Sequence, residues 1–361
     1  MILVEEGQSP LIVCLPHSGT DVPDAIEQRL NATGRLQADL AWRLERLFDF
    51  QGTLEATVVR STISRYVIDL DRDPKTSISV AQDPAQALCP VTTLDGKRIY
   101  QEGTEPGPTE IEQRILLFYN PFRKALRRQI GRLLRIHGKV ILLDCQSMRS
   151  HIKGVTENGL PLVSIGTEGG KSCDPDLRNV LVGSFEGLEG FTVSVDETIQ
   201  GGFINHTFGR PKLGLHAMTL LLAQRSYLRH ESPPFEPDKT RMARLQTVLQ
   251  NMMTRLVDAT SVSGESIDEN QVQALPVDML SHEAPEVDAP NNTAAQDSAD
   301  KADPAAESAA ETPEDLAVDM ADDLLEKAEI ISVDAKRPTQ ASSTQPSKVE
   351  EGPVTPLLVA E

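Results

Sequence analysis

The sequence feature that most constrains the fold is a short apolar run, V-I-L-L at residues 140–143, that leads into polar residues. Four consecutive apolar residues after a glycine are typical of a strand that is buried on both faces of a sheet. The residues that follow include Asp144, Gln146, Ser147 and Arg149. In open α/β sheets ligands bind beyond the carboxyl ends of the strands, so this stretch is a candidate functional site.

Apolar runs alternate with helical periodicity along residues 1–260. The pattern predicts strands over 11–15, 56–60, 65–72, 139–145, 161–165 and 191–195. It predicts helices over 36–50, 109–136, 175–183, 214–229 and 236–257, and a long loop or small hairpin within 75–107. This order favours a three-layer α/β domain with a mostly parallel sheet.

The last hundred residues differ sharply in composition from the rest. Residues 261–361 hold 23 of the 54 acidic and 5 of the 35 basic residues, a net charge of -18, and no Phe, Trp or Tyr. Such a composition cannot bury enough apolar area to offset the entropy of ordering. We therefore predict one domain over 1–260 and a disordered acidic tail over 261–361.

One segment of the tail, 313–331, places Leu316, Met320 and Leu324 along one helical stripe. Two interpretations remain open for it. The segment is either a short amphipathic helix that forms against a protein partner or the body itself, or part of an acidic, solubilising extension.

Charge and hydropathy give no sign of a nucleic-acid or membrane partner. Without the tail the chain is almost neutral, with 31 acidic and 30 basic residues, so its net charge identifies no partner, and we expect no nucleic-acid partner. No stretch approaches the roughly 18 apolar residues that span a bilayer, and the sequence M-I-L-V-E-E-G has no basic leader pattern. The four cysteines form no C-x-x-C pair. The expectation is a cytoplasmic protein without a membrane partner.

Polar residues at three places outside the 140–150 stretch have the chemistry of a site. His17 follows the first strand, Asp69 and Asp71 share one face of the predicted 65–72 strand, and His216 opens the predicted 214–229 helix. Each also has a structural interpretation. His17 is then a loop residue, Asp71 pairs with Arg65 or Arg72, and His216 is a core or capping residue.

Several motifs, taken together and in order, carry a family resemblance. They are P-H-S-G (16–19), S-R-Y-V-I-D-L-D-R (64–72), L-D-C-Q-S-M-R-S (143–150), G-G-F-I-N-H-T-F-G-R-P (201–211) and G-L-H-A-M-T-L-L-L (214–222). The sequence resembles the N-formylglutamate amidohydrolase family, metal-dependent hydrolases that release formate and glutamate at the end of a histidine degradation route. The resemblance implies a three-layer phosphorylase/hydrolase-like fold with zinc as the cofactor.

The resemblance also assigns roles to residues. It implies catalytic roles for His17, Asp144, Gln146 and His216, with His17 as a metal ligand. It implies substrate binding by Arg65, Asp69, Ser147 and Arg149, whose ligand is a small acidic N-acyl amino acid or a dicarboxylate.

The chain departs from the family at polar positions. Ala41 and Arg43 stand where D-T-D-W-H has an acid and a His, and Gln146 stands where D-[AC]-H-S has a His. His206 and Thr207 replace an Arg and a His of the family, and Leu221 replaces an acid. A catalytic zinc needs about three ligands from His, Asp, Glu or Cys, which neutral Gln and Ala do not supply. Arg43 places a fixed cation where a metal is expected.

Two interpretations follow. The departures favour a non-catalytic family member that keeps the fold and binds no zinc, and that uses the old pocket or the tail for binding. The alternative is an active amidohydrolase on an N-acyl acidic amino acid, with His17 in the metal shell and Arg65 or Arg149 holding carboxylates.

Overall fold

The computed structural model describes residues 1–75, 84–156 and 158–261. Apart from Ser261, the predicted acidic tail lies outside the described residues, and so does its proposed helix over 313–331.

Seven strands form a single mixed sheet in the order β1-β3-β2-β4-β7-β5-β6. Four neighbouring pairs are parallel, while β1 runs antiparallel to β3 and β5 runs antiparallel to β7. The strands are β1 Ile2–Glu5, β2 Leu11–Leu15, β3 Thr57–Ser61, β4 Val140–Met148, β5 Val163–Gly166, β6 Val193–Val195 and β7 Leu215–Ala223. The predicted mostly parallel sheet is confirmed.

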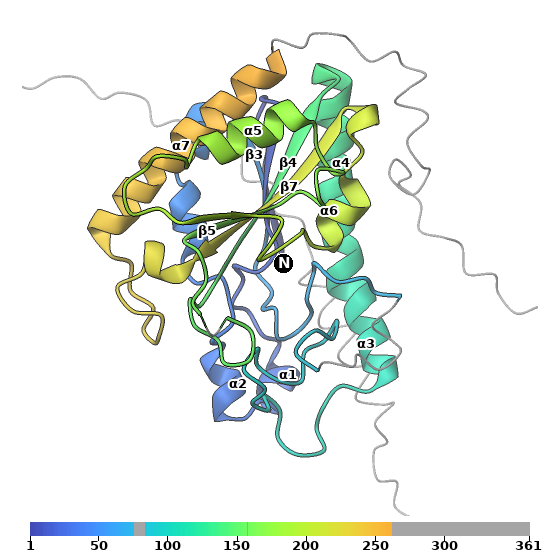
Figure 1. The fold of residues 1–361 in the computed structure, drawn as a ribbon. Helices are drawn as coiled ribbons and strands as arrows, with labels where there is room; N and C mark the ends of the chain where they lie inside the picture. Colours follow the sequence, from blue (N-terminus) through green and yellow to red (C-terminus); the bar gives the residue numbers. More distant parts are fainter. Residues whose placement is uncertain (76–83, 157, 262–361) are drawn as a thin grey trace, which may run out of the picture.

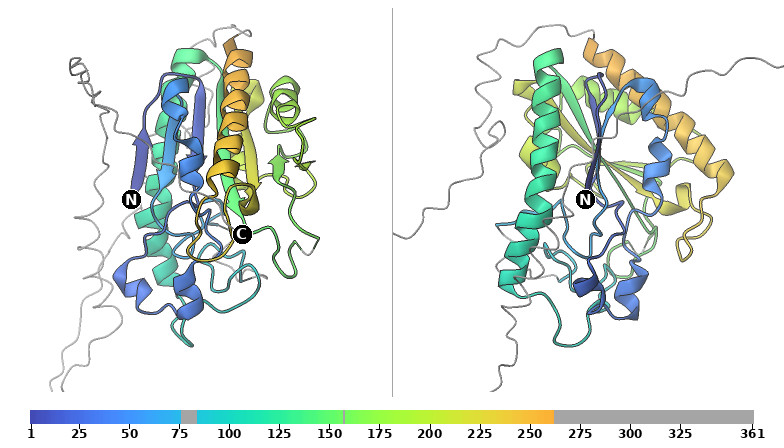
Figure 2. Two further views of the ribbon diagram at one scale, coloured as in Figure 1. Left: turned by 90° about the vertical axis from the view of Figure 1, so that its left-hand side faces the viewer. Right: turned by 180° about the vertical axis from the view of Figure 1, so that it is seen from behind.

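Helices cover both faces of the sheet, which gives the three layers that the sequence predicts (Figure 1). The helices are α1 Asp24–Glu27, α2 Ala32–Leu36, α3 Pro108–Arg114, α4 Asn120–His137, α5 Pro175–Gly183, α6 Phe203–Phe208 and α7 Lys239–Ser261. α5 and α7 lie on one face and α4 and α6 on the other, as the turned views also show (Figure 2). Buried aliphatic side chains of the central strands fill the space between each helical layer and the sheet.

The predicted long helix over 109–136 is present but is built from three pieces. α3 continues through one π-helical turn, Ile115–Tyr119, into α4, which ends at Gly138 in a left-handed conformation. The helices over 175–183 and 236–257 and the strands over 11–15, 56–60, 139–145, 161–165 and 191–195 are also confirmed within a few residues.

Three predicted elements are wrong. The 214–229 segment is not a helix but the fully buried strand β7, followed by a single 3-10 turn, Gln224–Ser226. The 36–50 segment is not one helix, because Gln37 and Arg43 have positive φ angles of 47° and 60° that interrupt it before the 3-10 turn Leu44–Phe48. The 65–72 segment forms turns rather than a strand. In each case packing of the apolar residues overrides the local periodicity.

No helix in the described segments is long and apolar enough to cross a bilayer.

Candidate functional site

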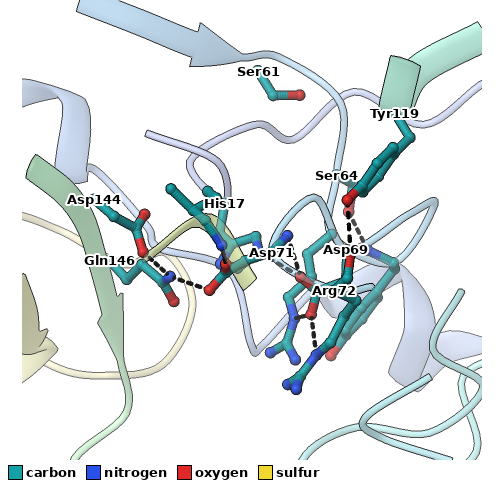
Figure 3. Close-up of polar contacts among 12 residues, drawn as sticks. His17, Ser61, Ser64, Asp69, Asp71, Arg72, Tyr119, Asp144 and Gln146 are labelled. Carbon is teal, nitrogen blue, oxygen red and sulfur yellow. Dashed lines mark hydrogen bonds and ion pairs between the residues drawn. The ribbon is translucent and has the colours of Figure 1, made fainter. Parts of the chain in front are cut away.

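A cluster of polar side chains lies at the carboxyl end of β2 and on the carboxyl-terminal half of β4 (Figure 3). Its members are His17 after β2, the turn residues Asp69 and Asp71, and Asp144 and Gln146 on β4. The structure therefore brings together residues that lie more than a hundred positions apart in the sequence. This is the edge of the sheet that the 140–150 stretch predicts for a site.

Asp69 is the most heavily bonded carboxylate of the cluster. Its Oδ1 atom accepts from His17 Nε2 at 2.8 Å and from the Asp71 amide at 3.0 Å. Its Oδ2 atom accepts from Arg65 Nε at 2.8 Å and from Arg72 Nε at 3.3 Å. Burial alone would raise the pKa of Asp69, but the charges of Arg65 and His17 hold that pKa well below its usual range.

The ionised state of Asp69 fixes how His17 is oriented. A carboxylate only accepts hydrogen bonds, so the Nε2 atom of His17 is the donor and carries the hydrogen. In a neutral ring the lone pair then lies on Nδ1, the atom that a carboxylate-oriented histidine offers to a metal. His17 itself is 7% exposed. The geometry thus fits the single metal-ligand role that the resemblance implies for His17.

Gln146 joins the two other carboxylates of the cluster. Its side-chain Nε2 donates to Asp71 Oδ2 at 2.9 Å and to Asp144 Oδ2 at 2.6 Å. The backbone amide of Ile204 also donates to Asp71, and the Thr219 hydroxyl donates to Asp144. A neutral amide therefore occupies the place between two buried acids where a cation would otherwise balance their charge.

Burial controls the acidity of these two carboxyl groups. It raises the pKa of Asp144 well above the usual range, and the negative charge of Asp71 raises it further. Burial also raises the pKa of Asp71, although the positive charge of His17 works against that rise. Asp71 lies so close to Gly202 that a Cβ atom there would stand 1.7 Å from Asp71 Oδ2. Glycine at position 202 is what lets the α6 segment approach the acid.

Position 41 lies next to His17 but contributes no polar group. The Ala41 amide donates to the His17 carbonyl oxygen at 3.0 Å, and the Ala41 methyl group is fully buried. The guanidinium of Arg43 lies over the Trp42 ring, 5.8 Å from its centroid. Within the described residues, no hydrogen bond or ion pair joins Arg43 to His17, Asp71 or Asp144. The expected cation at the centre of the site is therefore not supplied by Arg43.

The two arginines expected to hold substrate carboxylates are already paired with carboxylates of the chain. Arg65 bonds Asp69 rather than Asp71, the acid expected in the structural interpretation. Arg149 Nη2 donates to Asp39 Oδ1 at 2.7 Å and to Asp95 Oδ1 at 3.3 Å. Asp39 also accepts from the Tyr66 hydroxyl and the Leu94 amide. Arg149 thus holds loops together, and a substrate carboxylate would have to displace these acids.

Two further candidates lie on the other face of the sheet. Successive residues of a strand point to opposite faces, and Ser147 bonds the Tyr227 hydroxyl at 2.7 Å on the α7 side. His216 pairs in register with Ile141, also on that side, and its Nδ1 accepts from the Asp174 amide at the start of α5. Burial lowers the pKa of His216 to about 4. The structure therefore separates His216 and Ser147 from the cluster around Asp144, and His216 has the structural role of a buried cap.

The remaining family positions are two residues of α6 and Leu221 of β7, which pairs in register with Gln146 on the same face of the sheet. His206 is an exposed residue of α6 whose Nδ1 lies 3.3 Å from Glu168 Oε1, and Thr207 bonds the Phe203 carbonyl. Leu221 is buried among apolar side chains. The residue that sequence reasoning undervalued is Asp71, which was expected to pair with Arg65 or Arg72 and instead bonds Gln146. The D-L-D spacing in residues 69–71 was the signal that pointed to it.

Comparisons with known proteins decide the family. The sequence profile of the N-formylglutamate amidohydrolase family matches residues 9–228. This chain belongs to the N-formylglutamate amidohydrolase family. The N-formylglutamate deformylase of Pseudomonas putida is 32% identical to it over 252 residues, which cover 70% of this chain and 94% of that protein. The N-formylglutamate deformylase of Pseudomonas aeruginosa is 32% identical over 231 residues, covering 63% and 86% of the two chains.

The fold agrees with this family assignment. The crystal structure of N-formylglutamate amidohydrolase from Ralstonia eutropha JMP134 superimposes with a TM-score of 0.61 at 21% identity, covering 73% of this chain and 98% of that one. At this identity the likeness shows the shared fold.

The cluster of this amidohydrolase-family chain does not fit the zinc that the family implies. His17 Nδ1 is one suitable donor, but the amide of Gln146 presents hydrogens, not a lone pair, to Asp71 and Asp144. Position 41 presents a methyl group. Across the described segments, no group of three or more His, Cys, Asp or Glu side chains is arranged to hold a metal ion.

Proposed function

We propose that this protein is a non-catalytic member of the N-formylglutamate amidohydrolase family that binds no zinc. The observation that carries the proposal is the double hydrogen bond from Gln146 Nε2 to Asp71 and Asp144. This neutral amide satisfies both acids without a cation, so the pair has no need of a metal. Leu221 supplies no acid to act as a general base.

At the site around His17 and Asp144, the proposed ligand is a small acidic N-acyl amino acid or a dicarboxylate. The protein would bind this ligand without turning it over. The support for it is the survival of Arg65 and Arg149 at the site's edge. Both guanidinium groups pair with acids, so binding requires the ligand to replace Asp69, Asp39 or Asp95 in those pairs. A protein partner that docks on the tail is a separate proposal, and its residues lie outside the described part of the chain.

A second candidate, an active amidohydrolase, is favoured by one observation. The His17–Asp69 pair keeps the geometry in which a carboxylate orients an imidazole for catalysis or metal binding. A direct assay distinguishes the two candidates.

Formate release from N-formyl-L-glutamate tests the proposal. Full-length protein is assayed with added zinc beside the N-formylglutamate deformylase of Pseudomonas putida. We expect release at the rate of the protein-free blank. Release that His17→Ala abolishes, with the melting temperature retained, would instead establish the active amidohydrolase.

Ligand binding is measured on the same preparation by titration calorimetry with N-formyl-L-glutamate and glutamate. We expect a weak binding heat without formate release. Absence of heat for both ligands at millimolar concentration would remove the pocket as a carboxylate site.

A further inference from the structure

A cavity separate from the His17 cluster lies beside β5 near the start of α7. Its volume is about 370 Å³, in the range that accommodates small ligands. It is lined by Leu162, Gly190, Phe191, Arg225, Ser226, Arg241, Arg244 and Leu245. Three of these eight residues are arginines, and none is acidic.

The three guanidinium groups are held in place by backbone carbonyl oxygens. Arg225 Nη2 donates to the Leu160 carbonyl, and Arg241 Nη1 donates to the carbonyls of Arg225 and Leu228. Arg244 Nη2 donates to the Glu189 carbonyl. Carbonyl oxygens fix the direction of a guanidinium but leave its charge uncompensated. The cavity is therefore surrounded by three oriented positive charges.

Carboxylates are scarce around these charges, in contrast to the arginines of the first site. Among described residues, the acid recorded within 4 Å of the three guanidinium groups is Asp238, 3.9 Å from Arg241 Nε. Arg225 also keeps its Nη1 atom without an acceptor in the described chain. That atom is itself buried, so Arg225 adds a positive charge beside the cavity through a group that no carboxylate of the described residues neutralises.

The cavity lining also includes apolar side chains. Leu162, Phe191 and Leu245 line it, and the Arg244 guanidinium lies 5.2 Å from the centroid of the Phe191 ring. An aromatic or aliphatic group of a ligand could pack against these apolar side chains, while an oxyanion of the same ligand could bond the arginines.

We propose that this cavity binds a small organic dianion, a phosphate ester or a dicarboxylate whose oxygens meet Arg225, Arg241 and Arg244 and whose apolar part packs on Phe191. The site is independent of the His17 cluster and of whether that cluster is catalytic. Its ligand differs from the N-acyl glutamate of the proposed function, because it requires an apolar group next to the charge.

Titration calorimetry of the full-length protein at low ionic strength tests the site with phenyl phosphate and phthalate as probes, and with inorganic phosphate for comparison. We expect at least one of the two aromatic dianions to bind more tightly than inorganic phosphate. The probe that binds more tightly identifies the oxyanion. If neither aromatic probe binds at concentrations up to about 10 mM, the Kd is weaker than any useful affinity. That result overturns the proposal.

Substitutions locate the binding. Arg241→Gln and Arg244→Gln change exposed side chains, and each should weaken binding about tenfold, the effect of one charge-assisted hydrogen bond. Arg255→Gln, an exposed arginine of the same helix outside the cavity, is the matched control and should leave the affinity unchanged. Phe191→Ala should reduce the affinity for phenyl phosphate to that for inorganic phosphate. Equal affinities for the Arg244→Gln and Arg255→Gln proteins would place binding elsewhere and refute the assignment.

Discussion

Gln146 Nε2 lies 2.6 Å from Asp144 Oδ2, and this hydrogen bond, with its counterpart to Asp71, organises the centre of the site. Both acids are buried, at 0% and 9% exposure. Burial opposes ionisation of both carboxyl groups, and the charge of Asp71 opposes ionisation of Asp144 further, whereas the Gln146 amide favours the ionised forms by donating to both. The stability of the folded protein should therefore depend on the charges at positions 71, 144 and 146.

An acid at position 146, beside Asp71 and Asp144, should destabilise the folded protein. Gln146→Glu replaces two donated hydrogen bonds with another carboxyl group beside Asp71 and Asp144, and we expect a loss of about 3–5 kcal/mol in the free energy of unfolding at pH 7. Urea unfolding measures it. Gln250→Glu, the same chemical change at a half-buried residue of α7 far from these acids in the sequence, is the control and should change stability by less than about 0.5 kcal/mol. Similar values for the two variants would show that the amide bridge is unimportant for stability.

The purified protein should hold no stoichiometric transition metal. Zinc at two equivalents is added to the full-length protein, which is then dialysed against metal-free buffer and analysed by plasma mass spectrometry. We expect well below one equivalent, because among the described residues His17 is joined by no second His and position 41 carries no acid. One equivalent of retained zinc that is lost in His17→Ala would contradict the proposal of a metal-free site.

Stability should fall with rising pH because of Asp144. Its pKa is raised in the folded state, so the folded protein binds the proton more tightly than the unfolded chain, whose carboxyl titrates near pH 4. The contribution is fully present below that pH and is lost as the pH rises toward the folded pKa. Asp144→Asn keeps the shape and an acceptor for Gln146, so it should remove this slope and stabilise the protein by about 1–3 kcal/mol at pH 8. Denaturant titrations across pH 4–8 test this, and parallel curves for the two proteins would refute it.

His216 should produce the opposite slope. Burial lowers its pKa to about 4 in the folded state, while the unfolded ring titrates near 6.5. The unfolded chain therefore binds the proton first, and stability should fall as the pH drops from about 6.5 to 4, by on the order of 3 kcal/mol. His216→Asn retains an acceptor for the Asp174 amide and removes the titrating group. A variant that keeps the wild-type loss over this window would show that His216 is not its source.

Residues 262–361 should contribute little to the stability of the body. Their composition lacks aromatic residues and carries most of the net charge, so we expect their deletion to change the melting temperature by less than about 2 °C. If the segment 313–331 is a docking helix, the double substitution Leu316→Ser and Leu324→Ser should remove the same pull-down partners as the deletion. Identical partners for full-length, truncated and doubly substituted proteins would leave the tail as a charged extension.

Part of the site could be predicted from the sequence because its signals are local. The V-I-L-L run and the polar residues after it placed β4 and the site at the carboxyl end of that strand. The sequence also shows that positions 41 and 146 differ from the family pattern. In the structure, Ala41 places a buried methyl group beside His17, and Gln146 bonds two acids through its amide. The family follows from the same motifs.

Tertiary structure decided the points that depend on partners distant in the sequence. The apolar run L-H-A-M-T-L-L-L-A has the composition of either a buried helix or a buried strand, and pairing with β4 and β5 made it β7. Arg149 could be expected at a substrate until Asp39 and Asp95, brought from other loops, were found to bond it. His216 shares the sheet with Asp144 but lies on its opposite face, because the register of β7 against β4 pairs it with Ile141. Sequence determines which groups are present, whereas the strand register and the folding of distant loops determine which of them meet.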